Sequence, residues 1–418
     1  MLKFRHVRHP IFSARAVKER LAARLELRGV AERGERRYGG DPRYDLENVT
    51  NGFADHSADL TDDGDQIWRI CQAYRKAITQ QEAEPPEYRA SRWWEEVRER
   101  GLRPVMQALR RCDIDGLRAM YRTFFRDTCS TGLIGVPYGM SDVYFAETIP
   151  DVHRRYYMAD VLHRVDYWRS VTNGRFETSA LAAPKIGNPF GAIVEGTLVD
   201  AGAPARHYHA HRITELLDQS TGTVVEIGGG FGGTAYYLLR GRPRVRYIGF
   251  DIPESIALTS YYLMTAFPQL TFSLYEESET IEHAIADCDI VLMPSFELSR
   301  MPARSVDVVF SSHAMSDFSE SALATYLNHI SRVTRKAFLY VGVESAGEAA
   351  PGLTHRNHRS LKLVDTRRGE WHQHRSSHPH DIELTYAADL DSARPHNESA
   401  IHNRDGTLCR LSGAAVKD

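Results

Sequence analysis

The second half of the chain alternates between short apolar runs and longer stretches in which apolar residues recur every three or four positions. The short runs are rich in Val, Ile and Phe, as in strands buried on both faces, and the longer stretches have the spacing of amphipathic helices. This alternation predicts an α/β fold with a mostly parallel sheet covered by helices. The expected strands are 224–227, 245–250, 290–293, 306–310 and 337–341, and the expected helices are 206–217, 231–239, 254–266 and 320–333.

The first half of the chain has a different pattern. Apolar residues between positions 64 and 125 keep helical spacing, and another amphipathic helix is expected over 151–171. The tail after about residue 350 has weaker strand signals at 382–386 and 408–411. We therefore expect a helical N-terminal region (1–150), a helix and loop segment that connects or caps (151–205), and a sheet domain with C-terminal strands (206–418).

Composition narrows the functional classes. The net charge of −3 argues against broad binding to nucleic acids or anionic membranes, and no segment approaches the ~20 apolar residues that span a bilayer. The N-terminus lacks the apolar core of a secretory signal. Five scattered cysteines without a CxxC pair fit free thiols in a reducing compartment. We expect a cytoplasmic protein that binds neither nucleic acid nor membrane.

A glycine-rich loop follows the expected strand 224–227 and precedes a helix. Its sequence fits two cofactor motifs. Gly228, Gly230 and Gly233 satisfy G-x-G-x-x-G, the dinucleotide motif, with an acidic residue at the end of the next strand. Glu226, Gly228, Gly230 and Gly232 satisfy E-x-G-x-G-x-G, which is typical of class I methyltransferases that use S-adenosyl-L-methionine.

Three features favour S-adenosyl-L-methionine over a dinucleotide. Glu226 stands where dinucleotide enzymes usually keep an apolar strand residue, and the loop comes late in the chain, after a large helical region. The last strand signals are separated by a long loop, which is compatible with the antiparallel pair that closes class I methyltransferase sheets. The expected fold is therefore a Rossmann-like class I methyltransferase sheet with an antiparallel last strand.

Ligands of open parallel sheets bind at the carboxyl ends of the strands, so residues at these ends are the candidates for cofactor contacts. Asp251 can accept both ribose hydroxyls, and Glu226 can orient the loop or the ammonium group of the cofactor. Ser295 and Phe296 could frame the adenine, and Ser311 follows the fourth expected strand, beside the reactive methyl group. The expected cofactor residues are Glu226, Gly228, Gly230, Gly232, Asp251, Ile252, Ser295, Phe296 and Ser311.

Methyl transfer to an alcohol requires an aligned acceptor oxygen and a group that takes its proton. His313 stands after the fourth expected strand, and Asp317 follows one helical turn later as an orienting carboxylate. A structural histidine or a helix cap is the alternative for His313. Two histidine clusters, at 207–211 and 355–380, suggest a metal. Alternate positions on a helix diverge in the first cluster, and the second has no fixed ligand geometry and few acidic residues nearby, so we expect no metal site. A divalent ion that polarises a vicinal diol of the acceptor is the alternative.

The segments 226–233, 247–255 and 306–318 together resemble the sugar O-methyltransferase family of bacterial deoxysugar and surface-glycan pathways. The likeness covers about residues 185–345. It implies transfer of a methyl group to a hydroxyl of a nucleotide-linked sugar, a glycan or a glycoside. His313, Asp317 and Phe318 differ from the residues that family members often carry after the fourth strand.

Other interpretations stay open from the sequence. The acceptor could be a small molecule other than a sugar, or the chain could be a cofactor-binding accessory subunit without turnover. A nicotinamide oxidoreductase is the third alternative. The apolar stripes of the helical N-terminal region are assigned to the core, with a homo-oligomer interface as the alternative.

Overall fold

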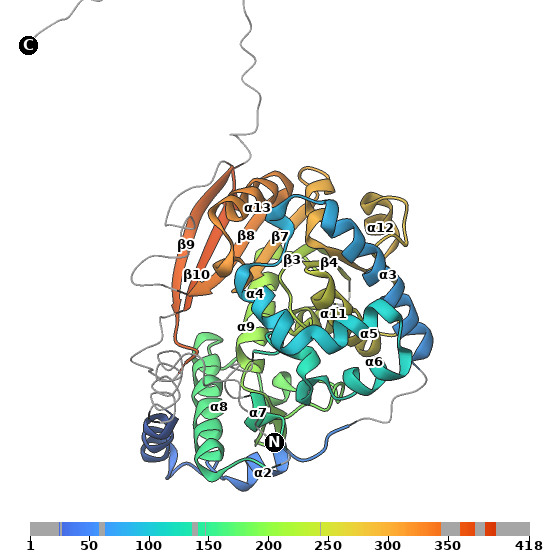
Figure 1. Cartoon of the computed structure of the whole chain (residues 1–418). Helices are drawn as coiled ribbons and strands as arrows, with labels where there is room; N and C mark the ends of the chain where they lie inside the picture. Colours follow the sequence, from blue (N-terminus) through green and yellow to red (C-terminus); the bar gives the residue numbers. More distant parts are fainter. Residues whose placement is uncertain are drawn as a thin grey trace, which may run out of the picture.

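The computed structural model describes residues 25, 27–57, 63–135, 141–146, 148–242, 244–343, 360–372 and 381–389. Its centre is an eight-stranded sheet with the strand order β5-β6-β4-β3-β7-β8-β10-β9 (Figure 1). The strands are β3 (Gly222–Ile227), β4 (Val245–Asp251), β5 (Phe272–Leu274), β6 (Ile290–Pro294), β7 (Val306–Ser312), β8 (Thr334–Val343), β9 (Leu361–Gly369) and β10 (Asp381–Ala388).

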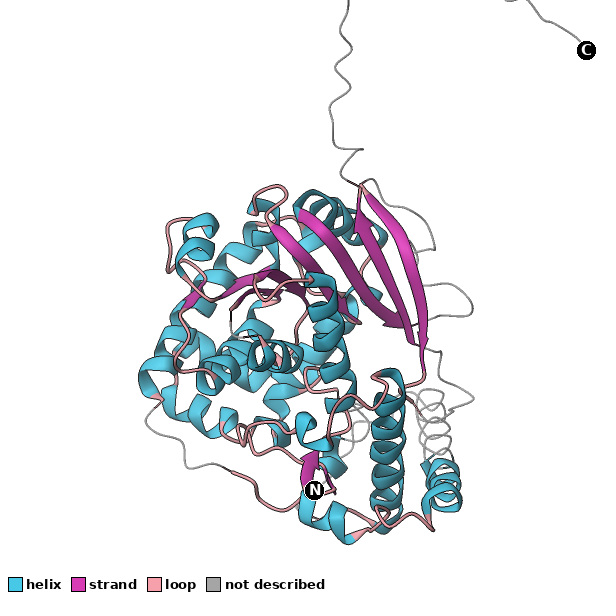
Figure 2. Ribbon diagram, turned by 180° about the vertical axis from the view of Figure 1, so that it is seen from behind, coloured by secondary structure: helices cyan, strands magenta, loops and turns pink. Residues whose placement is uncertain are grey.

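Strand direction in this sheet confirms the predicted fold class. The six strands from β5 to β8 pair in parallel. The last strand, β10, lies between β8 and β9 and is antiparallel to both. The chain is therefore an α/β protein with a Rossmann-like, mostly parallel sheet and an antiparallel last strand. Seen from behind, the sheet lies among helices and twists across the molecule (Figure 2).

The helices between the strands are α9 (Ala203–Leu217), α10 (Gly233–Gly241), α11 (Pro253–Ala266), α12 (Ile281–Asp287) and α13 (Glu320–Val333). Several begin as their sequences predict. Pro253 opens α11, and the Ser319 hydroxyl caps α13 by accepting a hydrogen bond from the backbone of Ala322. The strands β3, β6 and β7 are almost entirely buried, so their side chains are covered on both faces.

The five expected strands and four expected helices of the sheet domain are present, as is the strand signal at 382–386. The sequence did not predict β5, β9 or the small hairpin of β1 (Ala192–Val194) and β2 (Thr197–Val199). β9 is an edge strand whose residues alternate between partial burial and exposure, and it carries Lys362, Arg367 and Arg368. Because its sequence is largely polar, β9 has no apolar run that would have predicted a strand. The signal at 408–411 lies outside the described residues.

The N-terminal half is helical, as predicted. Its helices include α2 (Glu47–Gly52), α3 (Gly64–Ala83), α4 (Arg92–Val97), α5 (Arg103–Arg111), α6 (Ile114–Tyr121), α7 (Ser141–Tyr144) and α8 (Asp151–Val171), and residues 27–38 are helical as well. A π-helical turn (Arg98–Leu102) joins α4 to α5. None of the described helices has the length and apolar character that crossing a lipid bilayer requires.

The N-terminal helices are fastened to the sheet domain through α11. α3 lies along α11 (Figure 1). The Gln66 amide donates to the Tyr261 carbonyl over 3.0 Å, and the Arg69 guanidinium donates to the Phe272 carbonyl over 2.6 Å. One continuous hydrophobic core includes side chains from all three predicted segments. The division into 1–150, 151–205 and 206–418 stays a prediction.

Candidate functional site

The glycine loop lies at the carboxyl end of β3, in the middle of the sheet. Gly228, Gly230 and Gly232 have φ angles of 76°, 59° and 92°, in the left-handed region where glycine is favoured. A Cβ atom on Gly228 would lie 2.0 Å from the Cβ of Ala314. The three left-handed positions are therefore the glycines of E-x-G-x-G-x-G. Gly233, the third glycine of the dinucleotide motif, begins α10 without a positive φ.

Glu226 is buried beneath this loop. It is 3% exposed, and the Tyr247 hydroxyl donates to its Oε2 over 2.6 Å. Burial raises the pKa of Glu226 to about 7, and the negative charge of Asp251 acts in the same direction. A Cβ on Gly229 would lie 3.2 Å from the Glu226 carboxyl carbon, so the carboxyl group packs directly against the backbone of the turn.

Asp251 ends β4, the neighbouring strand, and faces the same loop. Its carboxylate accepts hydrogen bonds from the Gly230 amide (3.2 Å), the Ile252 amide (2.8 Å) and the Ser255 hydroxyl (2.6 Å). Burial raises the pKa of Asp251 to about 6, against the effect of these donors. The structure thus brings Asp251 and Ile252 together with the glycine loop. Oδ2 of Asp251 accepts two of these hydrogen bonds and Oδ1 accepts one, so Oδ1 keeps acceptor capacity for a further hydroxyl.

The other expected cofactor residues also lie at strand ends, but they are well packed. Ser295 and Phe296 follow β6 and are 6% and 1% exposed. The Phe296 and Tyr275 rings pack edge-on, with their centroids 5.5 Å apart. The Ser311 hydroxyl donates to the Ile227 carbonyl over 3.0 Å and ties β7 to β3. Adenine contacts by Ser295 and Phe296 stay a prediction.

His313 lies directly after β7, as expected. Its side chain is exposed, its φ is 62°, and its amide donates to the Val341 carbonyl over 2.7 Å. Asp317 ends the following short helix (Ala314–Asp317), and its side chain lies outside the described part of the structure. His313 therefore has an uncovered side chain at the tip of a central strand.

Two contacts to the glycine loop were missed from the sequence. The Leu133 carbonyl oxygen, from the N-terminal region, would lie 2.8 Å from a Cβ on Gly230. The Arg206 guanidinium on α9 pairs with Asp200 and lies 5.1 Å from the Phe231 ring centroid. Its buried Nε has no hydrogen-bond partner among the described residues.

The histidines at 207–211 diverge, as expected of alternate helical positions. His207 accepts a hydrogen bond from the Trp168 indole over 3.2 Å, His209 packs on Phe310, and His211 pairs with Glu215. Most of the second cluster lies outside the described residues. Within the described ranges, no group of three or more His, Cys, Asp or Glu side chains is placed to hold a metal ion.

No family model matches the chain, and no curated protein matches it either. Solved structures do match. The N-methyltransferase NodS from Bradyrhizobium japonicum WM9, in complex with S-adenosyl-L-homocysteine, is 14% identical, with 44% of this chain and 87% of that chain covered and a TM-score of 0.31. The magnesium protoporphyrin IX methyltransferase ChlM from Synechocystis PCC 6803, with the same compound bound, is 11% identical, with coverages of 55% and 99% and a TM-score of 0.31.

A third similar structure is the 1,6-didemethyltoxoflavin-N1-methyltransferase of Burkholderia thailandensis, with its substrate and S-adenosylhomocysteine bound. It is 16% identical, with 55% of this chain and 88% of that chain covered and a TM-score of 0.30. Because these scores and identities are low, we base the function of this chain on its own residues.

Proposed function

We propose that this protein is an S-adenosyl-L-methionine-dependent methyltransferase that acts on a hydroxyl of a sugar. The observation that supports S-adenosyl-L-methionine as the cofactor is the agreement between the glycine motif and the backbone conformation of the loop. The glycines of E-x-G-x-G-x-G are the three left-handed positions of the loop, and the carboxylate of Asp251 stands directly beside it. The sugar acceptor is supported by the sequence resemblance over about residues 185–345.

The sheet argues against the dinucleotide alternative. A dinucleotide-binding sheet continues with parallel strands in the order 3-2-1-4-5-6. Here the last strand, β10, is inserted antiparallel between β8 and β9. Burial of the Glu226 carboxyl group under the loop also fits the methyltransferase motif, in which this position is acidic.

Each end of the proposed cofactor has a candidate partner in this chain. Asp251 would accept from the ribose hydroxyls, the first of them at the lone pair of Oδ1 that the Gly230, Ile252 and Ser255 donors leave unused. Arg206, beside the N-terminus of α10, would hold the carboxylate of the methionine part, since its Nε is buried without a partner among the described residues. Glu226 would face the ammonium group directly or through water. When bound, the cofactor supplies a methyl group on a positively charged sulfur.

The chain's own task in the reaction is to align the acceptor and take its proton. His313 stands at the tip of β7 with an exposed imidazole ring, and we assign it the role of proton acceptor. Asp317, at the end of the following short helix, would orient it. This role of Asp317 is assigned only from its position in the sequence, four residues after His313.

A methyl-transfer assay tests this proposal. The full-length protein is incubated with S-adenosyl-L-methionine carrying a radiolabelled methyl group and a pool of nucleotide-linked sugars, glycosides and non-sugar alcohols. We expect label in the sugar fraction, sensitive to Asp251→Asn. The matched control is Asp307→Asn, because Asp307 is also buried but lies at the start of β7, where it accepts from the Thr223 amide and pairs with Arg335. Circular dichroism confirms that both variants are folded. Label in the non-sugar fraction alone would refute the sugar acceptor.

A further inference from the structure

A cavity of about 260 Å³ lies between α8, α9 and the strands β8, β9 and β10. Aromatic rings from three elements line it: Tyr167 of α8, Tyr208 of α9, and Trp371 just after β9. The centroids of the Trp371 and Tyr167 rings lie 4.7 Å apart, in an edge-on arrangement. The centroids of the Trp371 and Tyr208 rings lie 5.4 Å apart, with the ring planes tilted. These rings form an aromatic wall that suits the apolar face of a ring-shaped ligand.

Two carboxylates stand on another wall of the cavity. Asp381 and Glu383 are 5% and 6% exposed and, two positions apart on β10, project from the same face of the sheet. The Arg212 guanidinium donates to Glu383 over 2.9 Å, so this carboxylate is fixed in place. Carboxylates are hydrogen-bond acceptors, and Arg367 and Arg368, which also line the cavity, are donors. A ligand bound here therefore meets both, as hydroxyl groups, which donate and accept, require.

His209 offers the cavity a polar ring. It lines the cavity, it is 4% exposed, and no hydrogen bond of its ring occurs among the described residues. Burial lowers its pKa to about 3, and the neighbouring charge of His313 acts in the same direction, so the ring is neutral at pH 7. A neutral imidazole offers one donor and one acceptor nitrogen.

The cavity adjoins the strand tip at which we place the reaction. The His209 ring lies 5.6 Å from the ring of Phe310 in β7. Val341, another lining residue, accepts the backbone hydrogen bond of His313 through its carbonyl. A ligand in this cavity would therefore lie next to the 310–313 segment that ends β7.

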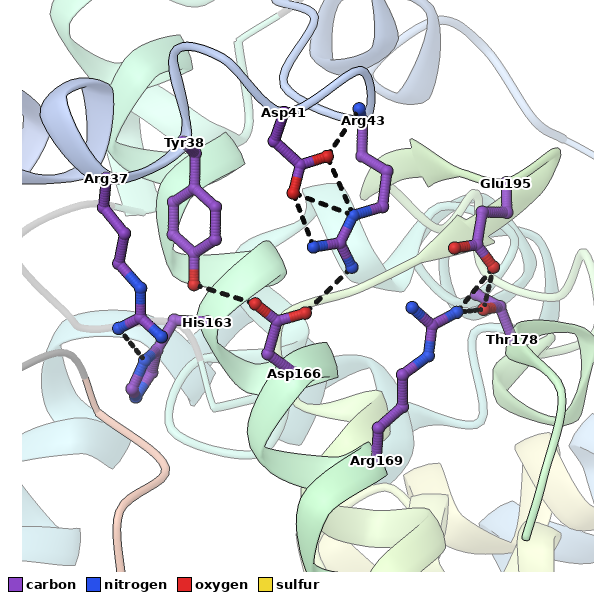
Figure 3. A network of polar contacts seen from close by, with 9 residues as sticks. All are labelled: Arg37, Tyr38, Asp41, Arg43, His163, Asp166, Arg169, Thr178 and Glu195. Atoms are coloured by element: carbon purple, nitrogen blue, oxygen red, sulfur yellow. Dashed lines mark hydrogen bonds and ion pairs between the residues drawn. The ribbon is translucent and has the colours of Figure 1, made fainter. Parts of the chain in front are cut away.

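Outside the cavity lining, α8 is tied to the segments 38–43 and 178–195 by a network of polar contacts (Figure 3). Asp166 accepts from the Arg43 guanidinium over 2.8 Å and from the Tyr38 hydroxyl over 3.2 Å. One turn further on, Arg169 pairs with Glu195 over 2.6 Å. Sites on fixed helices keep their geometry better than sites on loops.

We infer that this cavity is the methyl-acceptor site and that it binds a polyhydroxylated ring, with His209 accepting a hydrogen bond from one of the ring's hydroxyls. The aromatic wall would contact the C–H face of the ring, and Asp381 and Glu383 would accept from further hydroxyls. As an acceptor site the cavity rests on the proposed function, but its binding of a sugar ring can be measured without turnover.

Saturation-transfer NMR on the full chain tests the site. The probes are methyl glycosides of 6-deoxyhexoses and their dTDP-linked forms, each with and without S-adenosyl-L-homocysteine. Ser170→Trp fills the cavity from an exposed position on α8, and Ser170→Ala is its control. His209→Ala removes the unpartnered ring. His211→Asn is its matched control, because His211 lies on the same helix but pairs with Glu215.

We expect a probe to bind the wild type and both controls, Ser170→Trp to abolish the signal, and His209→Ala to weaken binding about tenfold. Circular dichroism confirms that each variant is folded. A wild type that binds none of the probes, or a Ser170→Trp variant that binds as well as the wild type, overturns the inference. A wild type that binds a glycoside but no S-adenosyl-L-homocysteine refutes the proposed function and leaves the sugar site standing.

Discussion

At the residue scale, Glu226 makes the stability of the protein depend on pH. Its pKa rises from 4.5 to about 7 on folding, so the native state holds this proton more tightly than the unfolded state. The resulting stabilisation is complete below about pH 4.5 and is lost as pH rises through 7. We predict that, between pH 5 and 8, the free energy of unfolding falls by roughly 2.5 kcal/mol more in the wild type than in Glu226→Gln.

Urea denaturation at several pH values measures this difference. Glu279→Gln is the control, because that side chain is 90% exposed and its loss should leave the pH dependence unchanged. Parallel curves for the wild type and Glu226→Gln would contradict the buried, protonated state of Glu226.

His313 yields a second prediction at this scale. Its backbone is left-handed, a conformation that Asn adopts more readily than Ala, so His313→Asn removes the imidazole with little strain. We expect cofactor binding near the wild-type value and methyl transfer reduced about a hundredfold, the size of a typical general-base contribution. Ser312→Ala, one position earlier, is the control. Unimpaired transfer by His313→Asn would give the role of proton acceptor to another group.

The candidate site could be predicted from the sequence only where its residues lie at the carboxyl ends of strands. Glu226 near the end of β3, Asp251 at the end of β4 and His313 after β7 are candidates by that rule, since these ends share one edge of a parallel sheet. Arg206 and His209 are on a helix that precedes the sheet, and helical spacing alone did not tell which of the histidines at 207–211 faces a cavity. Their roles depend on packing between distant segments.

At the scale of elements, the contact between the π-helical turn and α11 should carry much of the docking of the N-terminal helices. Arg98 pairs with Glu254, whose side chain is 1% exposed. Removing one partner leaves an uncompensated buried charge, so we predict that Arg98→Ala lowers the free energy of unfolding by about 3 kcal/mol. Arg100→Ala is the matched control, because Arg100 pairs with Glu96 on the surface and should change it by less than about 1 kcal/mol.

Chemical denaturation of both variants measures the two values. Equal effects of Arg98→Ala and Arg100→Ala would show that the Arg98 pair does not hold the helical region in place.

Among the elements, prediction succeeded for buried strands and failed for edge strands. β6 is buried at every position, so its apolar run was visible. β9 carries alternating polar residues because one of its faces is solvated, and β5 has three residues, too few for a pattern. The antiparallel place of β10 was expected from the methyltransferase interpretation, and the pairing confirms it.

At the scale of the whole molecule, the helical N-terminal region and the sheet domain meet at the glycine loop. Leu133 lies over Gly230, and α3 and the Arg98 turn hold α11, the helix that follows Asp251. We infer that the N-terminal region covers the cofactor site. The sequence separated the two regions because their periodicities differ, and periodicity carries no information on how they pack.

The central claim, that the loop binds S-adenosyl-L-methionine, is tested most directly by calorimetric titration of the full chain with S-adenosyl-L-homocysteine and with NAD. We predict that S-adenosyl-L-homocysteine binds, that NAD does not, and that Asp251→Asn weakens binding at least about tenfold through the lost ribose hydrogen bonds. Binding of NAD without binding of S-adenosyl-L-homocysteine would contradict the account.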